Sequence, residues 1–455
     1  MSSPRARRTR LCSLLLHDTL PRVLLVRSGE GWTLPAVEFD NDDEPEVQDV
    51  TDWLLVRHGV RSQFSREVVA AGTEFLQTGE RFHVYHVVGH RTGATAESRW
   101  WAEEELARAD LADETHVAVV SQCLQEAERE AVTLAPWQRR GWLDEAIDWA
   151  EVALERPVLE AQSLKSDSGG AVVMLETDAG TTYLKMVGPS STREAALLRC
   201  LAARCPGRVP ELIAHDRSRG WFLTRSLGDP LVSTLSRTDA ACQAAATLAT
   251  MQRALLENEH ELRTLRLPEA AIDLLPEQVD SLLHETETVT FGRFGLTATE
   301  LDVFASLRGD LVDACRRLAL LGPSGLEHGD FHLGNLCERD GQPAILDWTD
   351  ATLSHPFLTP FTGLLDGEPP ELRARVLAAY LGPWRGFATP EELAETLRLA
   401  EWLAPLHLAI GRWRELKRCV PTSRWELRDG APYFLRCFLD QPATRSGQHR
   451  ATVTP

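Results

Sequence analysis

The chain has 455 residues, of which 43% are apolar and 25% are charged, a length that allows two or three hydrophobic cores. Its formal net charge of −19 repels phosphate backbones, so no nucleic-acid partner is expected. No uninterrupted run of 18 apolar residues occurs, which argues against a membrane span on length alone.

The start of the sequence briefly imitates a signal peptide, because four arginines precede the apolar run Leu11–Leu16. His17 and Asp18 end that run and no small-residue cleavage site follows, so we interpret it as a strand of an intracellular protein. Nine cysteines, odd in number and scattered, indicate reduced thiols and a cytoplasmic location.

Residues 1–130 mix strand patterns with helix patterns and predict a first domain. A helical connector is expected over 131–154, where Pro136–Leu154 places apolar residues on one helix face. Within the first domain, alternating and 3.6-residue periodicities predict strands within 11–36, 67–76 and 81–90 and helices over 47–58 and 102–128.

The pattern restarts after the connector. Strand-forming sequence predominates over 155–227, with one helical stretch inside it, and helical periodicity predominates over 228–440. This order predicts an α+β fold with a small β-rich lobe before a large helical lobe. The tail 441–455 lacks aliphatic periodicity and is predicted to be disordered.

The most informative stretch is HGDFHLGN at 328–335, followed by AILDW at 344–348. Phosphoryl transfer requires one carboxylate that orients an incoming hydroxyl and accepts its proton, and oxygen ligands that hold magnesium on the nucleotide phosphates. Asp330, Asn335 and Asp347 supply these groups, and the apolar residues before Asp347 predict a strand that ends at it. Taken alone, His-Gly-Asp could be a turn and Asp347 a helix cap; the full string favours the catalytic interpretation.

This string resembles the signature of the aminoglycoside phosphotransferase and choline kinase group, HGDxxxxN followed about a dozen residues later by a metal-binding aspartate. The resemblance implies a bilobal protein-kinase-like fold that uses ATP and Mg²⁺. It also implies that Asp330 is the catalytic base, that Asn335 and Asp347 are magnesium ligands, and that His328 braces the loop. The resemblance covers about 290 residues, from the connector to Asp440.

The upstream lobe is expected to hold the nucleotide. Lys185 lies in the strand-like run TYLKMV and Glu194 follows nine residues later in a helical stretch. In kinases such a lysine and glutamate pair to position the α- and β-phosphates, which gives Lys185 a catalytic and a nucleotide-binding role. Two alternatives stay open, because Lys185 could snorkel from an edge strand and Ser191–Glu194 is also a capping box.

Two further segments are candidates for nucleotide contacts. Ser168, Gly169 and Gly170 lie between strands where kinases fold a loop over the phosphates, although a two-glycine turn can also be a plain hairpin. The second segment is the run from Trp221 to Gly228, which resembles the inter-lobe hinge of the family, where backbone groups contact adenine. Its candidate residues are Leu223, Thr224 and Arg225.

One position departs from the family pattern. The family usually has a proline and then an aspartate that steadies the catalytic loop, whereas here His355-Pro356-Phe357-Leu358 is followed by Thr359. Threonine can donate and accept a hydrogen bond but carries no charge, so we expect activity with a less rigid loop.

Residues 11–128 resemble a Nudix fold, an α/β/α domain, through the run VLLVRSGEGWTLP, through His58-Gly59-Val60 and through Trp100-Trp101. Nudix hydrolases bind magnesium through clustered glutamates on a helix. The aligned positions here are Asp52, Trp53, Leu54, Val56 and Arg57, so those glutamates are missing. We therefore predict a degenerate Nudix-like module that binds, docks or regulates, and we interpret the acidic run at 38–49 as a solvated face.

The leading hypothesis is a phosphotransferase that moves the γ-phosphoryl group of ATP to a hydroxyl of a small molecule. The acidic composition would suit a cationic substrate, but acidic residues are spread along the whole chain. The alternatives are pyrophosphate hydrolysis by residues 1–130, which the missing glutamates disfavour, and a non-catalytic nucleotide sensor whose Nudix-like domain docks a partner. Substrate, preference for ATP over GTP and oligomeric state do not follow from the sequence.

Overall fold

The computed structural model describes residues 8–17, 20–29, 31–40, 45, 47–68, 80–87, 97–108, 111, 114–188, 193–256, 259–442 and 444. It divides the chain into two compact units, unit 1 with Met1–Met186 and Cys419–Trp425, and unit 2 with Val187–Arg418 and Glu426–Pro455. The division lies inside the region predicted as the small kinase lobe, and the predicted domain boundaries remain predictions.

Unit 1 begins with a mixed seven-stranded sheet. The strands are β1 (Arg8–Leu16), β2 (Arg22–Ser28), β3 (Gly31–Thr33), β4 (Ala36–Asp40), β5 (Ser62–Val68), β6 (Glu80–Val87) and β7 (Ser98–Ala102). The central strand of the sheet, β1, pairs antiparallel with the second strand of the chain, β2, and parallel with the sixth, β6.

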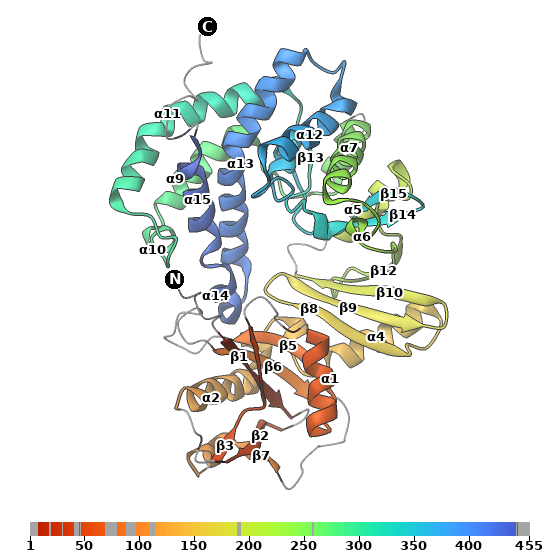
Figure 1. Cartoon of the computed structure of the whole chain (residues 1–455), viewed down its shortest axis with the longest axis vertical. Coiled ribbons are helices and arrows are strands. Elements are labelled where there is room, and N and C mark those ends of the chain that lie inside the picture. The colour runs from red at the N-terminus through yellow and green to blue at the C-terminus, as the bar shows by residue number, and fades with distance from the viewer. Residues whose placement is uncertain are drawn as a thin grey trace, which may run out of the picture. The chain divides into compact units, whose positions relative to one another are not determined.

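Helices cover both faces of this sheet (Figure 1). Along β1, Leu11 and Leu15 face the core under helix α1 (Val47–His58), while Cys12 and Leu14 face the core that includes helix α2 (Glu114–Glu128). The continuous apolar run of β1 follows from burial on both faces, and the layers form the expected α/β/α arrangement.

The predicted elements of this region are confirmed in part. The helix over 47–58 is present, and the strand expected over 81–90 is β6. The helix expected over 102–128 is present in part: Ala102 ends strand β7, which pairs with β2, Glu103–Arg108 form a 3-10 helix, and the α-helix begins at Glu114. The strand expected over 67–76 begins earlier and ends at Val68, and residues 69–79 lie outside the described part.

The connector and the first kinase strands complete unit 1. Helix α3 (Glu130–Thr133) and the 3-10 turn Pro136–Gln138 precede helix α4 (Trp142–Leu154), which confirms the predicted connector helix. Three antiparallel strands follow, β8 (Glu160–Ser166), β9 (Gly170–Thr177) and β10 (Gly180–Val187). The distant segment 419–425 joins this unit, where Thr422 Oγ1 donates to the Thr133 carbonyl at 2.6 Å.

Unit 2 contains the helical lobe that the sequence predicts. Its helices are α5 (Glu194–Arg204), α6 (Leu231–Thr234), α7 (Arg237–Leu256), α8 (Glu259–Thr264), α9 (Leu275–Leu283), α10 (Thr286–Val289), α11 (Ala298–Leu321), α12 (Pro370–Leu381), α13 (Pro390–Arg418), α14 (Arg424–Leu427) and α15 (Gly430–Asp440). Its strands form three pairs, β11 (Leu212–Asp216) with β12 (Trp221–Arg225), β13 (Gly325–Glu327) with β16 (Thr352–Ser354), and β14 (Leu336–Arg339) with β15 (Gln342–Ile345).

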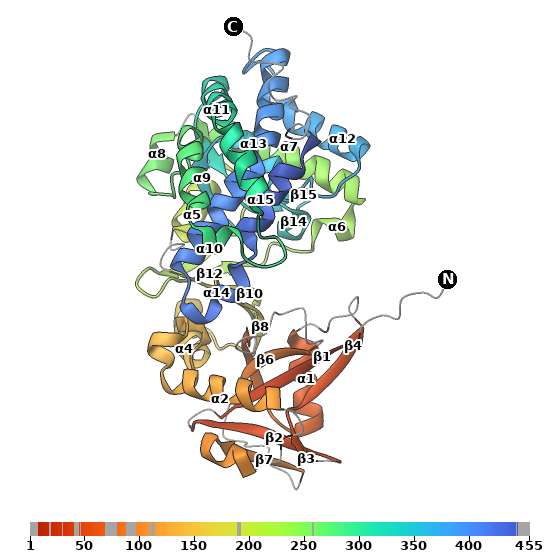
Figure 2. The same cartoon turned by 90° about the vertical axis from the view of Figure 1, so that its left-hand side faces the viewer.

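Long helices with defined starts build the core of this lobe. Thr297 and Glu300 form a reciprocal capping box at the start of α11, and Thr389 with Glu392 does the same before α13. Helices α9, α11, α13 and α15 pack together, as Figures 1 and 2 show. Helix α7 buries alanines along its length, which allows close packing against α12.

Two expectations concern the chain as a whole. All nine cysteines are thiols, as their scattered positions predict. Of the helices in the described ranges, none combines the length and the apolar character needed to cross a bilayer. The predicted disordered tail lies outside the described residues, except for 441, 442 and 444.

Candidate active site

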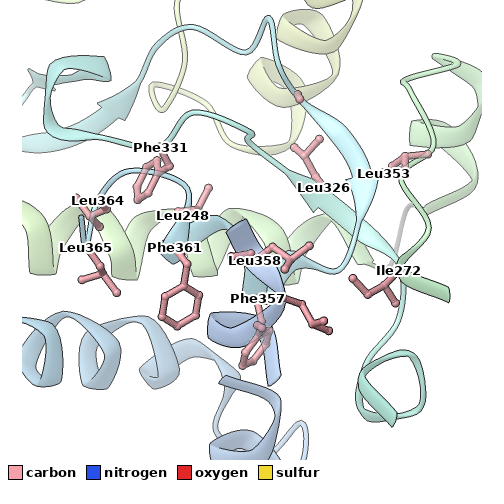
Figure 3. Packing of buried hydrophobic residues seen from close by; sticks show 14 of the residues in the cluster. Leu248, Ile272, Leu326, Phe331, Leu353, Phe357, Leu358, Phe361, Leu364 and Leu365 are labelled. Carbon is pink, nitrogen blue, oxygen red and sulfur yellow. The ribbon is translucent and has the colours of Figure 1, made fainter. Parts of the chain in front are cut away.

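The predicted catalytic segment lies between two short strand pairs of unit 2. Strand β13 ends at Glu327, the loop 328–332 follows, and a 3-10 turn over Leu333–Asn335 leads into the β14–β15 hairpin. Leu326 precedes the stretch Glu327–Asp330 that contains His-Gly-Asp, and Phe331 follows it. Both side chains are buried in the core shown in Figure 3. The loop is therefore anchored by apolar side chains near both ends, while the polar side chains between them are held by hydrogen bonds.

His328, which is predicted to brace the loop, is fully buried and has a contact at each ring nitrogen. Its Nε2 lies 2.9 Å from the Leu346 carbonyl, and its Nδ1 accepts the Asp330 amide N–H at 3.3 Å. These two contacts require the proton on Nε2 and a neutral ring. Burial agrees with that assignment, because it lowers the pKa of His328 below its usual value.

Asp330 and Asn335 are brought together by the turn. Asn335 Nδ2 donates to the Asp330 carbonyl at 3.0 Å and lies 3.5 Å from Asp330 Oδ2. The Asp330 side chain is 37% exposed, and His332 Nε2 lies 3.5 Å from its carboxylate. Because the Asn335 amide nitrogen is used inside the loop, its oxygen is the atom left to bind a cation.

Asp347 follows the β14–β15 hairpin, which confirms the predicted strand before it. Its backbone has φ +54°, a left-handed conformation that is uncommon for residues other than glycine but more accessible to aspartate than to most. The Leu346 N–H donates to the Asn335 carbonyl at 2.8 Å, which ties the two predicted magnesium ligands to neighbouring backbone. Thr349 donates through Oγ1 to Asp347 Oδ1 at 2.7 Å.

Glu194 contacts the residues around Asp347. Its Oε1 accepts the Trp348 N–H at 3.1 Å, and its Oε2 lies 2.8 Å from the Thr349 hydroxyl, whose single proton is shared between Glu194 and Asp347; the Glu194 side chain is buried. The glutamate thus supports the segment that carries a predicted metal ligand. The alternative interpretation places Glu194 in a capping box over Ser191–Glu194. It stays a prediction, because residues 191 and 192 lie outside the described part of the chain.

The other predicted nucleotide contacts include residues on strands β10 and β12. Lys185 is on strand β10 in unit 1, and its pairing with Glu194 stays a prediction. Leu223, Thr224 and Arg225 form the end of β12, where Leu223 and Thr224 are buried and Arg225 pairs with Glu211 at 3.0 Å. Their backbone role toward adenine also stays a prediction.

The glycine turn between β8 and β9 is a closed hairpin tip. The amides of Gly169 and Gly170 donate to Asp167 Oδ1 at 2.9 and 3.2 Å, and the Asp167 amide donates to the Gly170 carbonyl at 3.0 Å. Ser168 lies at the tip. A phosphate contact by the two glycine amides would require Asp167 to release them, so the hairpin alternative accounts for the observed geometry.

Sequence reasoning missed three charged residues around the loop. Asp350 faces Arg412, with 3.9 Å between Oδ2 and Nη1, and Arg412 also donates to Glu415 at 2.9 Å. Desolvation and the negative charges of Glu415, Asp347 and Asp330 raise the pKa of Asp350, and Arg412 opposes this; because the side chain is 42% exposed, water screens much of the effect. Asp350, Arg412 and Glu415 thus add both negative and positive charge beside the loop.

The Nudix-like helix offers a different set of side chains. Asp52 on α1 accepts a hydrogen bond from Gln48 at 2.8 Å, and its neighbours along the helix are the apolar and basic residues predicted above. Among the described residues, the side chains that gather as metal ligands do are Cys12, Glu80 and His116, which belong to β1, β6 and α2. The resemblance to Nudix domains stays a prediction.

The structure thus brings Asp330, Asn335 and Asp347 together on one loop and the hairpin that follows it. The chain belongs to the phosphotransferase enzyme family, whose model matches residues 160–396. It is accordingly a phosphotransferase with an alcohol group as acceptor.

Several solved structures are similar to this chain at low sequence identity. A choline/ethanolamine kinase family protein from Mesorhizobium loti is 18% identical, with 68% of this chain and 98% of that chain covered and a TM-score of 0.44. An ethanolamine kinase from Plasmodium vivax is 14% identical, with 66% and 86% covered and a TM-score of 0.45. A spectinomycin phosphotransferase is 12% identical, with 65% and 97% covered and a TM-score of 0.41. No curated protein matches the chain.

Proposed function

We propose that this phosphotransferase uses ATP with Mg²⁺ and transfers the γ-phosphoryl group to a hydroxyl of a small molecule. The observation that supports it best is the grouping of Asp330, Asn335 and Asp347 within one loop and the hairpin that follows it. Such a grouping matches the parts that phosphoryl transfer requires.

Each side chain has one task in this proposal. Asp330, partly exposed at the loop surface, orients the acceptor hydroxyl and takes its proton as the new P–O bond forms. Asn335 and Asp347 hold Mg²⁺, which neutralises charge on the nucleotide phosphates when bound. His328 and Glu194 contact neither substrate, and they keep the backbone of the loop and of the Asp347 segment in place.

The test is ADP release from ATP and Mg²⁺ by the full chain, across a panel of aminoglycosides, macrolides, amino alcohols and nucleosides. One class of compound should stimulate release, and Asp330→Ala should reduce that stimulation by about 10²–10⁴-fold, the usual contribution of a general base. Asp340→Asn is the matched control, because Asp340 lies in the turn of the β14–β15 hairpin and its side chain is 95% exposed.

Two outcomes separate the enzyme from the alternative. Stimulation that vanishes in Asp330→Ala and persists in Asp340→Asn supports the transferase and identifies its substrate class. Mg²⁺–ADP binding that is equal in all three proteins, without stimulation by any compound, would instead favour a nucleotide sensor.

A further inference from the structure

Glu327 is a buried carboxylate directly before the catalytic loop. It ends strand β13, its side chain is fully buried, and it lies within a hydrophobic core. An ionised carboxylate in such a place is costly unless every oxygen finds a partner. Here one oxygen accepts the Gly329 N–H at 2.7 Å, and the other contacts Thr352 Oγ1 at 3.2 Å and His407 Nε2 at 3.1 Å.

The partner on helix α13 keeps the carboxylate charged. Burial alone would raise the pKa of Glu327, but the hydrogen bond and charge of His407 and the Gly329 amide together bring it below its ordinary value. His407 is itself largely buried and lies 80 residues away in the sequence. Helix α13 and strand β13 thus hold one charge against the start of the catalytic loop.

Thr359 contacts the same stretch of backbone more weakly. The His328 N–H lies 3.4 Å from Thr359 Oγ1, whereas the next amide, of Gly329, lies 2.7 Å from Glu327 Oε1. The Thr359 hydroxyl also receives Gln252 Nε2 at 3.2 Å, so it is shared. A hydrogen bond to an ionised acceptor is roughly twice as strong as one between neutral groups.

We propose that Glu327 is the positioning residue of the catalytic loop, and that it supplies the fixed negative charge which the neutral Thr359 does not. The inference rests on the proposed function, in which Asp330 is the base, because the amide that Glu327 holds belongs to the residue before Asp330. Glu327 contacts no substrate in this proposal. It acts on the reaction through the backbone of Gly329.

The proposal predicts a reversal between two substitutions. In Glu327→Leu the loop loses its charged acceptor, and Thr359→Asp added to that variant places a new carboxylate beside the adjacent amide and should restore the loop. In the otherwise unchanged chain, Thr359→Asp puts a second carboxylate next to Glu327, and like charges in a buried place repel. Thr359→Asp should therefore restore the catalytic loop in Glu327→Leu and disturb the loop in the otherwise unchanged chain.

Two readouts measure the loop separately from the fold. Amide hydrogen exchange in the segment 325–336 should be faster in Glu327→Leu and return toward the original rate in the double variant. With the acceptor found by the panel, kcat should fall by about 10²-fold in Glu327→Leu while KM for ATP changes little, because misplacing a base affects the chemical step. Glu327→Gln keeps an acceptor without the charge and should lie between.

A cavity variant of unit 2 controls for lost stability. Leu282→Ala removes a fully buried side chain on helix α9, outside the catalytic loop. It should lower the melting temperature without speeding exchange at 325–336. If Leu282→Ala speeds that exchange as much as Glu327→Leu does, the role assigned to Glu327 is only structural and the proposal is wrong.

The remaining outcomes decide the proposal in the same way. Thr359→Asp that has the same effect with and without Glu327 would overturn it, and so would unchanged exchange in Glu327→Leu. The exchange measurement needs no substrate, so it remains decisive even if no compound stimulates ADP release and the proposed function fails.

Discussion

Gly329 occupies a position that no other residue can take without moving the loop. Its backbone has φ +85°, and a Cβ placed there would lie 2.4 Å from the Asp350 carbonyl oxygen. Both the left-handed conformation and the close approach require glycine. The Gly329 N–H also donates to Glu327 Oε1. The residue directly before Asp330 therefore has both the positive φ and the contact with the buried carboxylate.

Gly329→Ala should therefore destabilise the protein and remove most of its transferase activity, because both the clash and the positive φ must be relieved by moving the loop. Gly341→Ala is the control, since Gly341 has φ +73° but nothing lies within 4 Å of its added Cβ. The control should cost only about 1–2 kcal/mol, the strain of a left-handed residue. Urea unfolding and ADP release of both variants check this, and equal losses would contradict the role of the Asp350 contact.

Which residues the sequence predicted depends on how local their signal is. His328, Asp330, Asn335 and Asp347 lie within 20 residues, so the local sequence predicted a short loop followed by a strand that leads to Asp347, and that strand is present as β15. The partner of Glu327 could not be predicted, because His407 comes from a helix far along the chain and one histidine on an apolar helix has no distinctive pattern. Asp350 and Arg412 were missed for the same reason.

At the scale of elements, the β8–β9 hairpin is anchored by its neighbours within unit 1. Trp137 Nε1 donates to the Asp167 carbonyl at 2.8 Å, and Ser166 Oγ donates to the Ser65 carbonyl. Ser65 lies at an irregularity in the pairing of β5 with β6, where an extra residue is not paired in the ladder. Its hydroxyl in turn donates to the Gln138 carbonyl at 2.9 Å. The hairpin tip is thus tied to the first sheet and to the connector.

Trp137→Phe removes the indole donor but keeps most of the ring. We expect amide exchange at 166–170 to increase about fivefold, because a typical hydrogen bond contributes about 1 kcal/mol. The matched control is Trp101→Phe, since the buried Trp101 N–H has no hydrogen-bond partner among the described residues. If both variants exchange alike, the Trp137 contact does not hold the tip. Mg²⁺–ADP affinity of the same variants would test whether the tip contacts the nucleotide.

Element boundaries were predictable where periodicity was unbroken and wrong where it was not. The connector helix and the long helices of unit 2 follow from their apolar spacing and capping residues. The helix expected over 102–128 was wrong at its start, because Ala102 pairs with Arg22 of β2 as the end of a strand and Glu103–Arg108 form a 3-10 helix. That pairing depends on a strand about 75 residues earlier, which local periodicity does not report.

At the scale of the whole molecule, both units bury histidines that must stay neutral. Burial lowers the pKa values of His83, His86 and His355 to about 3. Nearby arginines contribute to the lowering at His83 and His86. The unfolded chain, with ordinary histidine pKa values, then binds more protons than the folded protein between about pH 6.5 and 3. Stability is therefore complete above pH 6.5 and falls as the pH is lowered through this window.

On acidification from pH 6.5 to 5.5, each of these histidines should lower the free energy of unfolding by about 1 kcal/mol. Urea unfolding midpoints measured across this range should decrease on acidification. His86→Gln should reduce the slope with pH, while His284→Gln, whose side chain is exposed, should leave it unchanged. Identical slopes in the original chain and in His86→Gln would show that this burial does not control the acid response.

The segment 419–425 completes unit 1 although it is translated after almost all of unit 2. Until the ribosome releases it, the Thr133 carbonyl lacks Thr422 and the fully buried Gln138 side chain lacks Ser423. Unpaired polar groups of this kind keep a protein region open to water. In a chain that has not reached residue 419, Thr133 and Gln138 lack these two partners, so we expect the region around them to be less protected from solvent than in the full chain.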